Sequence, residues 1–400
     1  MTKRILYVSM TRPNKNGSGA EQRCASHLEA LEKIGVVDTL ILCRENDQCT
    51  ADDIWLGSIG MERNNKRLSV PIFDKNIVRT VFGFSEHVAW LDSADKQILR
   101  DRIISRNYEI IFANRVLCAN FLVSSLLKDI KNYRIYVDVD DINSDFVYRN
   151  IKLKKFSDGV QTLVARTIEL FFSKFIEAKV ISSSSGVFVC SHEDIKKING
   201  RNPNHIAAIL PNITQDKPLP APKYRNKIDL LFVGSLYYHP NMDGVTWFIS
   251  EIWEPLRKEF AENITLTIVG RGSDHDIENI RHMPGISFHL NVPDLTPYYS
   301  ASNACVIPIR YGGGTSIKTI EAMSVGRPVL STPVGVRGLG IKDGTHYIEF
   351  DDAAGFIRAC HQLLEDPALG RSLAKAARGV WEESFTQSAV DRIIASTIAG

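Results

Sequence analysis

The chain has 400 residues, of which 44% are hydrophobic and 24% are charged, and its formal net charge is +2. This length suits two domains of ordinary size, and the near-neutral charge does not favour a nucleic-acid partner. No apolar run approaches the roughly 20 residues of a membrane-spanning helix. The seven cysteines are scattered and include no Cys-x-x-Cys pair, so we expect reduced thiols in a cytoplasmic protein and no zinc site.

The first half alternates short apolar runs with stretches that have helical periodicity. The first run is too short for the core of a secretion signal and is interpreted as a strand. A loop with Gly17 and Gly19 follows it, and then a helix with Cys24 and Leu28 on one face. Strands are expected at Ile5–Met10, Thr39–Cys43, Glu109–Ala113, Arg134–Val139 and Val187–Cys190. This alternation predicts a parallel sheet with helices on both faces.

A cluster of prolines in the middle of the chain separates two halves. The residues around Pro211, Pro218, Pro220 and Pro222 include little that could form a core. We interpret this segment as a linker between two domains. The predicted division is a first domain over 1–212, a linker over 213–227, a second domain over 228–385 and a terminal helix over 386–400. The packing partner of that helix stays open, and a return to the first domain is one option.

The second half repeats the alternating pattern. Its first apolar run leads to Gly234-Ser235 and a helix with Phe248 and Ile252 on its apolar face. A later helical stretch, Phe356–Ala377, is broken at Asp366-Pro367. Strands are expected at Leu230–Val233, Thr265–Val269, Ile286–Leu290, Ala304–Ile309 and Val329–Ser331. The fold class is therefore α/β, with two doubly wound, Rossmann-like domains whose strand-end loops face a central cleft.

The segment from Ile309 to Pro328 is the most informative part of the chain. Three glycines, 312–314, lie between a buried strand and a helix with Ile317, Ile320 and Met323 on one face. Unpaired N–H groups and the dipole at such a helix start attract anions. Lys318 adds a full charge. At 1.5 Å per residue, Glu321 lies about 9 Å along the axis from Thr315 at the helix start, which suits a nucleoside diphosphate with its ribose.

A basic stretch, Lys152–Phe156, leads into a long predicted helix with Leu163, Leu170, Phe171, Phe175 and Ile176. A basic amphipathic helix can lie on a membrane surface. An ordinary helix that buries its apolar face in the core is the commoner case, and we favour it. Peripheral contact with the inner face of the cell membrane stays open.

The order of motifs resembles that of GT-B glycosyltransferases, family 4 in particular, and the branch that builds bacterial surface polysaccharides. The resemblance is specific over residues 230–335 and thin over 45–180. It implies a GT-B fold and a retaining transferase of the hexosyltransferase type, which moves a sugar from a nucleotide-diphosphate donor to a glycan or lipid-linked acceptor. It implies no metal and no cofactor. The matching motifs are Val233–Leu236, His239–Asp243, Ile268–Gly272, Val292–Asp294, Gly312–Glu321, Gly326–Val329, Gly17-x-Gly19, Ser191–Asp194 and Pro211-Asn212.

The family's roles carry over onto the matching positions. The donor phosphates would lie against the glycines and backbone N–H groups of Gly17, Gly19, Gly234, Ser235, Gly313, Gly314, Thr315, Ser316 and Ile317. The base would be bordered by Gly270, Arg271 and Val292. Glu321 would accept hydrogen bonds from the ribose hydroxyls.

Four residues are the candidates for catalysis. Lys318 and Arg310 would offset the charge that develops on the leaving nucleoside diphosphate. Asn114 and Asp140 follow strands of the first domain and would face the acceptor side of the cleft, near Asp138 and Asp141. Asp138-x-Asp140 also resembles the metal motif of GT-A enzymes, but it lacks that context, and no metal is expected.

The sequence departs from the family pattern at three places. Ser235 and Met242-Asp243 stand where family members often carry Arg and Lys. The Glu-x7-Glu pattern needs an acid eight positions before Glu321, where the chain has Gly313, and the histidine that often follows the third strand of the first domain is absent. Two alternatives therefore stay open, a GT-B nucleotide-sugar epimerase and a non-catalytic nucleotide-sugar-binding protein. An NAD-dependent oxidoreductase is disfavoured because Gly17-x-Gly19 lacks the third glycine of the dinucleotide fingerprint.

Overall fold

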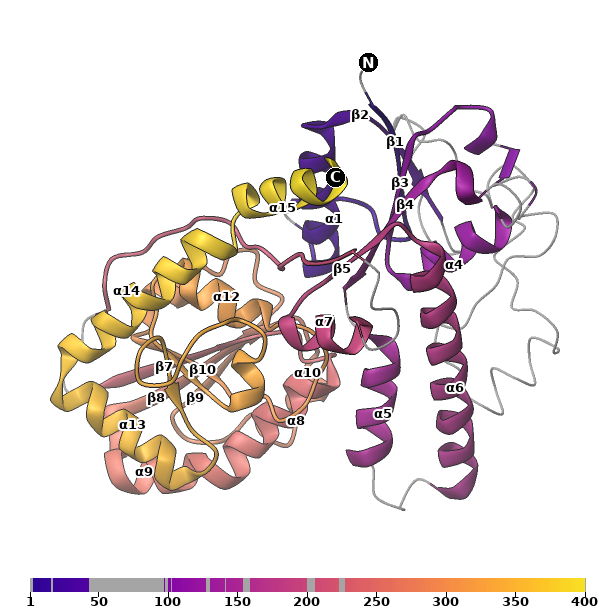
Figure 1. Cartoon of the computed structure of the whole chain (residues 1–400). Coiled ribbons are helices and arrows are strands. Elements are labelled where there is room, and N and C mark those ends of the chain that lie inside the picture. Colours follow the sequence, from indigo (N-terminus) through magenta and orange to yellow (C-terminus); the bar gives the residue numbers. More distant parts are fainter. Residues whose placement is uncertain are drawn as a thin grey trace. The chain divides into compact units, whose positions relative to one another are not determined.

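A computed structural model of the chain describes residues 3–15, 17–42, 97, 100–101, 103–126, 130–140, 142–153, 159–199, 206–222 and 227–399. The chain forms two compact units, shown in Figure 1. Unit 1 contains residues 1–211 and 387–400, and unit 2 contains residues 212–386. The terminal helix thus belongs to unit 1, and the segment expected to be a linker belongs to unit 2.

Unit 1 is built on a six-stranded sheet in the order β2-β1-β3-β4-β5-β6, and every neighbouring pair is parallel. The central strands are buried along nearly their whole length, as expected for a parallel sheet covered on both faces. The strands are β1 (Lys3–Ser9), β2 (Gly35–Ile41), β3 (Ile110–Asn114), β4 (Arg134–Asp140), β5 (Gly186–Val189) and β6 (Ile206–Ile209).

The helices of unit 1 include the C-terminal helix α15. Gln387 Nε2 donates a hydrogen bond to the Ser26 carbonyl oxygen at 3.0 Å, and Lys33 pairs with Asp391 at 2.5 Å. These contacts join α15 to α1, and Figure 1 shows the two helices side by side. The helices are α1 (Gly19–Glu32), α4 (Val116–Ser125), η2 (Ile130–Asn132), α5 (Asn143–Leu153), α6 (Gly159–Ser183), α7 (His192–Asn199) and α15 (Gln387–Ala399).

Unit 2 has a second six-stranded sheet in the order β12-β11-β10-β7-β8-β9, again with parallel pairs throughout. The first strand of this unit, β7, is central, and the chain winds outward from it first on one side and then on the other. This is the doubly wound order of dinucleotide-binding folds. The strands are β7 (Ile228–Val233), β8 (Ile264–Gly270), β9 (Ile286–Leu290), β10 (Ala304–Ile307), β11 (Val329–Ser331) and β12 (Ile348–Glu349).

The helices of unit 2 enclose a core around Trp253, Phe248, Phe350 and Phe356. The predicted break at Asp366-Pro367 is present, because the Asp366 side chain accepts the Ala368 N–H and caps a new helix. The helices are α8 (His239–Trp247), η4 (Phe248–Trp253), α9 (Glu254–Phe260), η5 (Ala261–Asn263), α10 (Asp274–Ile277), α11 (Thr296–Ala301), α12 (Ile317–Ser324), η6 (Pro333–Val336), α13 (Ala353–Glu365) and α14 (Pro367–Ser384).

The predicted doubly wound α/β architecture is confirmed, and the differences are local. Strands β6 and β12 were not predicted, because each is short and carries little periodicity. Strand β10 ends at Ile307 and not at Ile309, since Pro308 has no N–H to continue the ladder. The expected end of the second strand, Cys43, lies outside the described residues.

Candidate active site

The predicted phosphate segment lies at the point of unit 2 where ligands of doubly wound sheets bind. Strands β7 and β10 are neighbours, and the chain leaves them in opposite directions around the sheet. The loop at Gly234 follows β7, and the loop 308–316 follows β10. Ligands of open α/β sheets occupy the crevice outside the carboxyl ends of the strands at such a switch point.

The glycine turn before α12 is held by an arginine from a distant loop. Gly314 has a φ of 58°, a left-handed conformation that costs a glycine little. The Arg337 guanidinium donates a hydrogen bond from Nη2 to the Gly312 carbonyl oxygen at 2.9 Å. This contact fixes the turn that precedes the helix start. Arg337 was not predicted, because nothing in its local sequence connects it to the turn.

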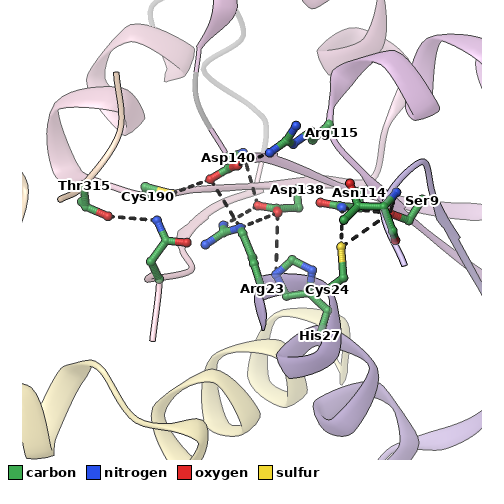
Figure 2. Close-up of polar contacts among 12 residues, drawn as sticks. Ser9, Arg23, Cys24, His27, Asn114, Arg115, Asp138, Asp140, Cys190 and Thr315 are labelled. Atoms are coloured by element: carbon green, nitrogen blue, oxygen red, sulfur yellow. Dashed lines mark hydrogen bonds and ion pairs between the residues drawn. The ribbon is translucent and has the colours of Figure 1, made fainter. Parts of the chain in front are cut away.

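The start of α12 presents polar groups at its N-terminus. Ser316 is the N-cap residue, and its carbonyl oxygen accepts the N–H groups of Thr319 and Ile320. The N–H groups of the residues just before them have no acceptor within the helix. The Ser316 Oγ is buried and has no hydrogen-bond partner among the described residues. Thr315 is held in place because its Oγ1 accepts a hydrogen bond from Asn212 Nδ2 at 3.1 Å (Figure 2).

Lys318 and Glu321 lie in the first turns of α12 and interact electrostatically. Burial lowers the pKa of Lys318 to about 8, although the charge of Glu321 acts in the other direction. Burial likewise raises the pKa of Glu321, against the effects of a hydrogen bond from Tyr299 and of the Lys318 charge. The Tyr299 hydroxyl lies 3.3 Å from Glu321 Oε2 and was not among the predicted site residues. Both charged groups have lost part of their hydration, so hydrogen bonds or ion pairs with a polar ligand would stabilise their charged forms.

Close packing explains why glycine occupies the positions at the ends of β7 and β8, and this packing was not predicted. A Cβ atom on Gly270 would lie 1.9 Å from the Gly234 carbonyl oxygen, and one on Gly234 would lie 2.8 Å from Asn241 Nδ2. Asn241 in turn donates a hydrogen bond to the Ser235 carbonyl oxygen at 2.8 Å. Arg271 follows Gly270, and its carbonyl oxygen accepts a hydrogen bond from the Leu236 N–H. The contact of these residues, and of Val292, with a nucleotide stays a prediction.

Arg310 has a different environment from the one expected. Its guanidinium makes two hydrogen bonds to the Asp243 carboxylate, at 2.9 and 2.6 Å, and lies 5.5 Å from the centre of the Trp247 ring. Its charge is therefore already compensated. Lys318 is the better candidate for the cation that faces a phosphate.

Unit 1 has its own switch point between β1 and β3. Gly17 lies in the loop after β1, and a Cβ atom there would come within 2.5 Å of Glu21 Oε2. That carboxylate accepts hydrogen bonds from the Ser18 N–H at 2.6 Å and from the Ser18 Oγ at 2.7 Å. A side chain at position 17 would thus force a shift of the Glu21 carboxylate that caps α1, which begins at Gly19. The predicted contact of both glycines with the donor remains a proposal.

The Asn114 side chain is buried and does not present its amide to solvent. It is 3% exposed, and its Nδ2 lies 3.0 Å from Ser9 Oγ and 2.9 Å from Cys24 Sγ (Figure 2). These contacts tie β3 to β1 and α1. Asn114 is therefore omitted from the catalytic residues proposed below.

Two strained residues lie side by side where β3 and β4 end. Arg115 has a φ of 74° and Asp140 a φ of 57°, and the Arg115 N–H donates a hydrogen bond to the Asp138 carbonyl oxygen. Asp140 also interrupts the register between β4 and β5. Left-handed conformations in residues other than glycine cost free energy that the rest of the fold must offset. Such residues are found most often at functional sites. The predicted Asp141 lies outside the described residues.

A buried ion pair supports this strand end. The Arg23 side chain makes two hydrogen bonds to Asp138, at 2.7 and 2.6 Å, and lies 3.5 Å from Asp140 (Figure 2). Burial and the Arg23 charge hold the pKa of neighbouring His27 well below its usual value, so its ring is neutral. Asp138 thus gives both carboxylate oxygens to an arginine. Over the described ranges, no three His, Cys, Asp or Glu side chains gather as a metal site would require.

Comparison with known proteins gives a family match for most of unit 2. Residues 227–366 match the family "Glycosyl transferases group 1". An uncharacterized 44.6 kDa protein in the cps region of Klebsiella pneumoniae is 23% identical over 375 residues, which cover 89% of each chain.

Solved structures of similar proteins confirm the GT-B fold. Sucrose-phosphate synthase from Thermosynechococcus elongatus superimposes with a TM-score of 0.67 at 18% identity, over 99% of this chain and 98% of that one. The Anabaena protein HepE, solved with UDP and glucose, gives a TM-score of 0.64 at 12% identity over the whole of both chains. Unit 2 thus contains a glycosyltransferase domain, and the expectation of a glycosyltransferase is confirmed. None of the described helices is both long and apolar enough to cross a bilayer.

Proposed function

We propose that the protein is a retaining glycosyltransferase of family 4, which uses a nucleoside-diphosphate sugar and acts in cell-surface polysaccharide synthesis. The helix start of α12 carries the proposal. It combines N–H groups without intrahelical acceptors, the unpaired Ser316 Oγ, the Lys318 ammonium and, one turn later, the Glu321 carboxylate. These groups match the oxygens of a diphosphate and the hydroxyls of a ribose.

The reaction follows from these positions together with the family resemblance. The acceptor hydroxyl attacks the anomeric carbon on the face from which the diphosphate leaves, and a phosphate oxygen takes the hydroxyl proton. The N–H groups at Ser316 and Ile317, with the charge of Lys318, stabilise the negative charge on the leaving group. Preorganised donors supply the stabilisation, so the proposal requires no metal ion and no cofactor.

The acceptor is proposed to be a glycan or a lipid-linked glycan that approaches the end of β4 in unit 1. Asp140 is the acid at this point, and its strained backbone is held by the Arg23–Asp138 pair. The cps-region relative and the resemblance to the surface-polysaccharide branch both favour such an acceptor.

Binding measurements with a panel of nucleotides test the donor site. Calorimetry and thermal shift with UDP, GDP and their sugars should show one bound nucleotide that raises the melting temperature. Lys318→Ala and Glu321→Gln should each weaken that binding by about tenfold or more, which is about 1.4 kcal/mol. Lys342→Ala, a change at an exposed lysine of the same unit, is the matched control and should bind normally.

Two results would overturn parts of the proposal. Unchanged nucleotide affinity in both site variants would remove the donor site from α12. Conversion of the nucleotide sugar without any acceptor would identify an epimerase, whereas a transferase releases the nucleoside diphosphate only as the acceptor is glycosylated.

A further inference from the structure

Helix α6 of unit 1 carries an exposed apolar stripe. Its 25 residues run from Gly159 to Ser183. Four large apolar side chains are exposed to solvent, and two of them are phenylalanines that are more than half exposed. The exposed fractions are 45% for Leu163, 46% for Val164, 68% for Phe171 and 58% for Phe175.

These four side chains lie on one face of the helix. At about 100° per residue they fall within an arc of about 120°, which makes one continuous stripe along the axis. The opposite face is also apolar, because Ile176 and Val180 are buried in the core of unit 1 and Phe172 packs against that core. The expectation that the core covers the apolar residues of this helix is therefore correct for Ile176 and wrong for Leu163, Phe171 and Phe175.

The charges of α6 are sorted between its two faces. The acidic residues Glu169 and Glu177 are 3% and 1% exposed, and the Glu177 carboxylate accepts hydrogen bonds from the Ser144 N–H and Oγ. Lys174 is exposed and lies on the same arc as Phe171. Among the described residues of α6, the outward arc thus combines apolar side chains with positive charge and holds no acid.

We propose that this stripe docks on the surface of an anionic lipid membrane, with Phe171 and Phe175 inserted at the headgroup level. Contiguous exposed apolar side chains mark an interaction surface. A helix with apolar side chains and lysine on its outward face binds lipid through buried apolar area and attraction to anionic headgroups. The basic stretch Lys152–Phe156 lies largely outside the described residues and is not part of this surface.

A second copy of the chain fits the stripe less well than lipid does. A two-fold contact between two such stripes would bring both copies of Lys174 into one apolar interface. The described arc offers no carboxylate to neutralise them, and an unpaired buried charge is costly. A membrane surface lets the ammonium groups extend to the phosphates while the rings insert.

Vesicle sedimentation of the full-length protein tests the proposal without any nucleotide present. The wild-type protein should bind vesicles of phosphatidylcholine and phosphatidylglycerol more tightly than vesicles of phosphatidylcholine alone. The double variant Phe171→Ser/Phe175→Ser should lose affinity by about a hundredfold, about tenfold for each ring removed from lipid. Lys174→Glu should reduce the preference for anionic vesicles.

Matched controls separate the stripe from general surface effects. Val164→Ser should weaken vesicle binding, whereas Val36→Ser, at a valine of β2 that is 55% exposed, should not. Lys196→Glu, at an exposed lysine of α7, is the charge control for Lys174→Glu. All these positions are on the surface, so the variants should keep the wild-type melting temperature.

Three outcomes would overturn the proposal. The first is absence of binding to the anionic vesicles, and the second is equal loss of binding in the stripe variants and the controls. The third is a wild-type dimer that dissociates in the double phenylalanine variant and does not bind vesicles, which would assign the stripe to a second copy. Nucleotide affinity should be the same in all variants, so a failure here leaves the donor site untouched.

Discussion

Lys318 combines a positive charge with a site that disfavours that charge. Its pKa of about 8 lies below the ordinary lysine value of 10.5, because burial removes water from the ammonium group. A bound diphosphate would supply the missing counter-charge and raise this pKa again. Binding of the nucleotide above pH 8 should therefore take up a proton.

The affinity for a nucleoside diphosphate should consequently fall as the pH rises through 8. Below that pH the free protein already carries the charge, and above it the affinity should drop by up to about tenfold per pH unit. Calorimetry in buffers of different ionisation enthalpy measures both the affinity and the proton uptake. Lys318→Met should bind weakly at every pH, and a wild-type affinity that stays constant from pH 7 to 9.5 would exclude Lys318 from the site.

The free energy of unfolding of the ligand-free protein should rise with pH, whereas the nucleotide affinity should fall. The folded protein releases the Lys318 proton near pH 8, while the unfolded chain keeps it to 10.5. The unfolded state therefore binds more protons between these values, and this residue makes the fold more stable as the pH rises across that window. In the proposed site, the charge of Lys318 would thus lower stability near neutral pH and raise the affinity for a nucleoside diphosphate.

At the scale of elements, the glycine at the end of β8 has a role in packing that can be tested without a ligand. Gly270 allows the end of β8 to approach β7, since its Cβ position lies 1.9 Å from a backbone oxygen. Gly270→Ala should destabilise unit 2 by about 3 kcal/mol, because backbone atoms cannot move aside cheaply. Urea unfolding monitored by tryptophan fluorescence measures the change.

Gly379 in α14 provides the matched control. Nothing lies within 4 Å of its Cβ position. Gly379→Ala should stabilise the protein by roughly 0.5–1 kcal/mol, as expected in a helix interior. Equal effects of the two substitutions would mean that the close approach of β7 and β8 does not matter for stability.

The sequence predicted the elements that have long periodic patterns and missed those that depend on distant contacts. Both sheets followed from alternating apolar runs, and the α12 segment followed from glycines, lysine and glutamate close together in the chain. Arg337 could not be connected to Gly312 without the fold, and neither could the pairing of Arg310 with Asp243. The exposure of Phe171 was also hidden, because helical periodicity does not reveal which of two apolar faces a core will cover.

At the scale of the whole molecule, the chain passes between the units twice, near Pro211 and near Thr386. Helix α15 contributes contacts to α1 and β4, including a hydrogen bond from Arg134 to the Ile398 carbonyl oxygen at 2.7 Å. Unit 2 is therefore connected to unit 1 at both of its ends.

Truncation after Thr386 should lower the melting temperature of unit 1 and leave unit 2 unchanged. The deletion removes the buried apolar residues Ala389, Val390, Ile394 and Ile398 of α15, which packs against α1, whereas the core of unit 2 includes no residue of α15. Differential scanning calorimetry, with and without a nucleotide to mark the transition of unit 2, resolves the two events. A loss of stability in both units, or in neither, would contradict this assignment of α15.

The return of α15 also fixes an order of events during synthesis. Every residue of unit 2 leaves the ribosome before α15 does. Unit 1 can therefore complete its fold only after unit 2 has been synthesised. Until α15 has been made, the surface of α1 that it contacts is exposed in the nascent chain, and a chaperone that binds this surface would delay aggregation.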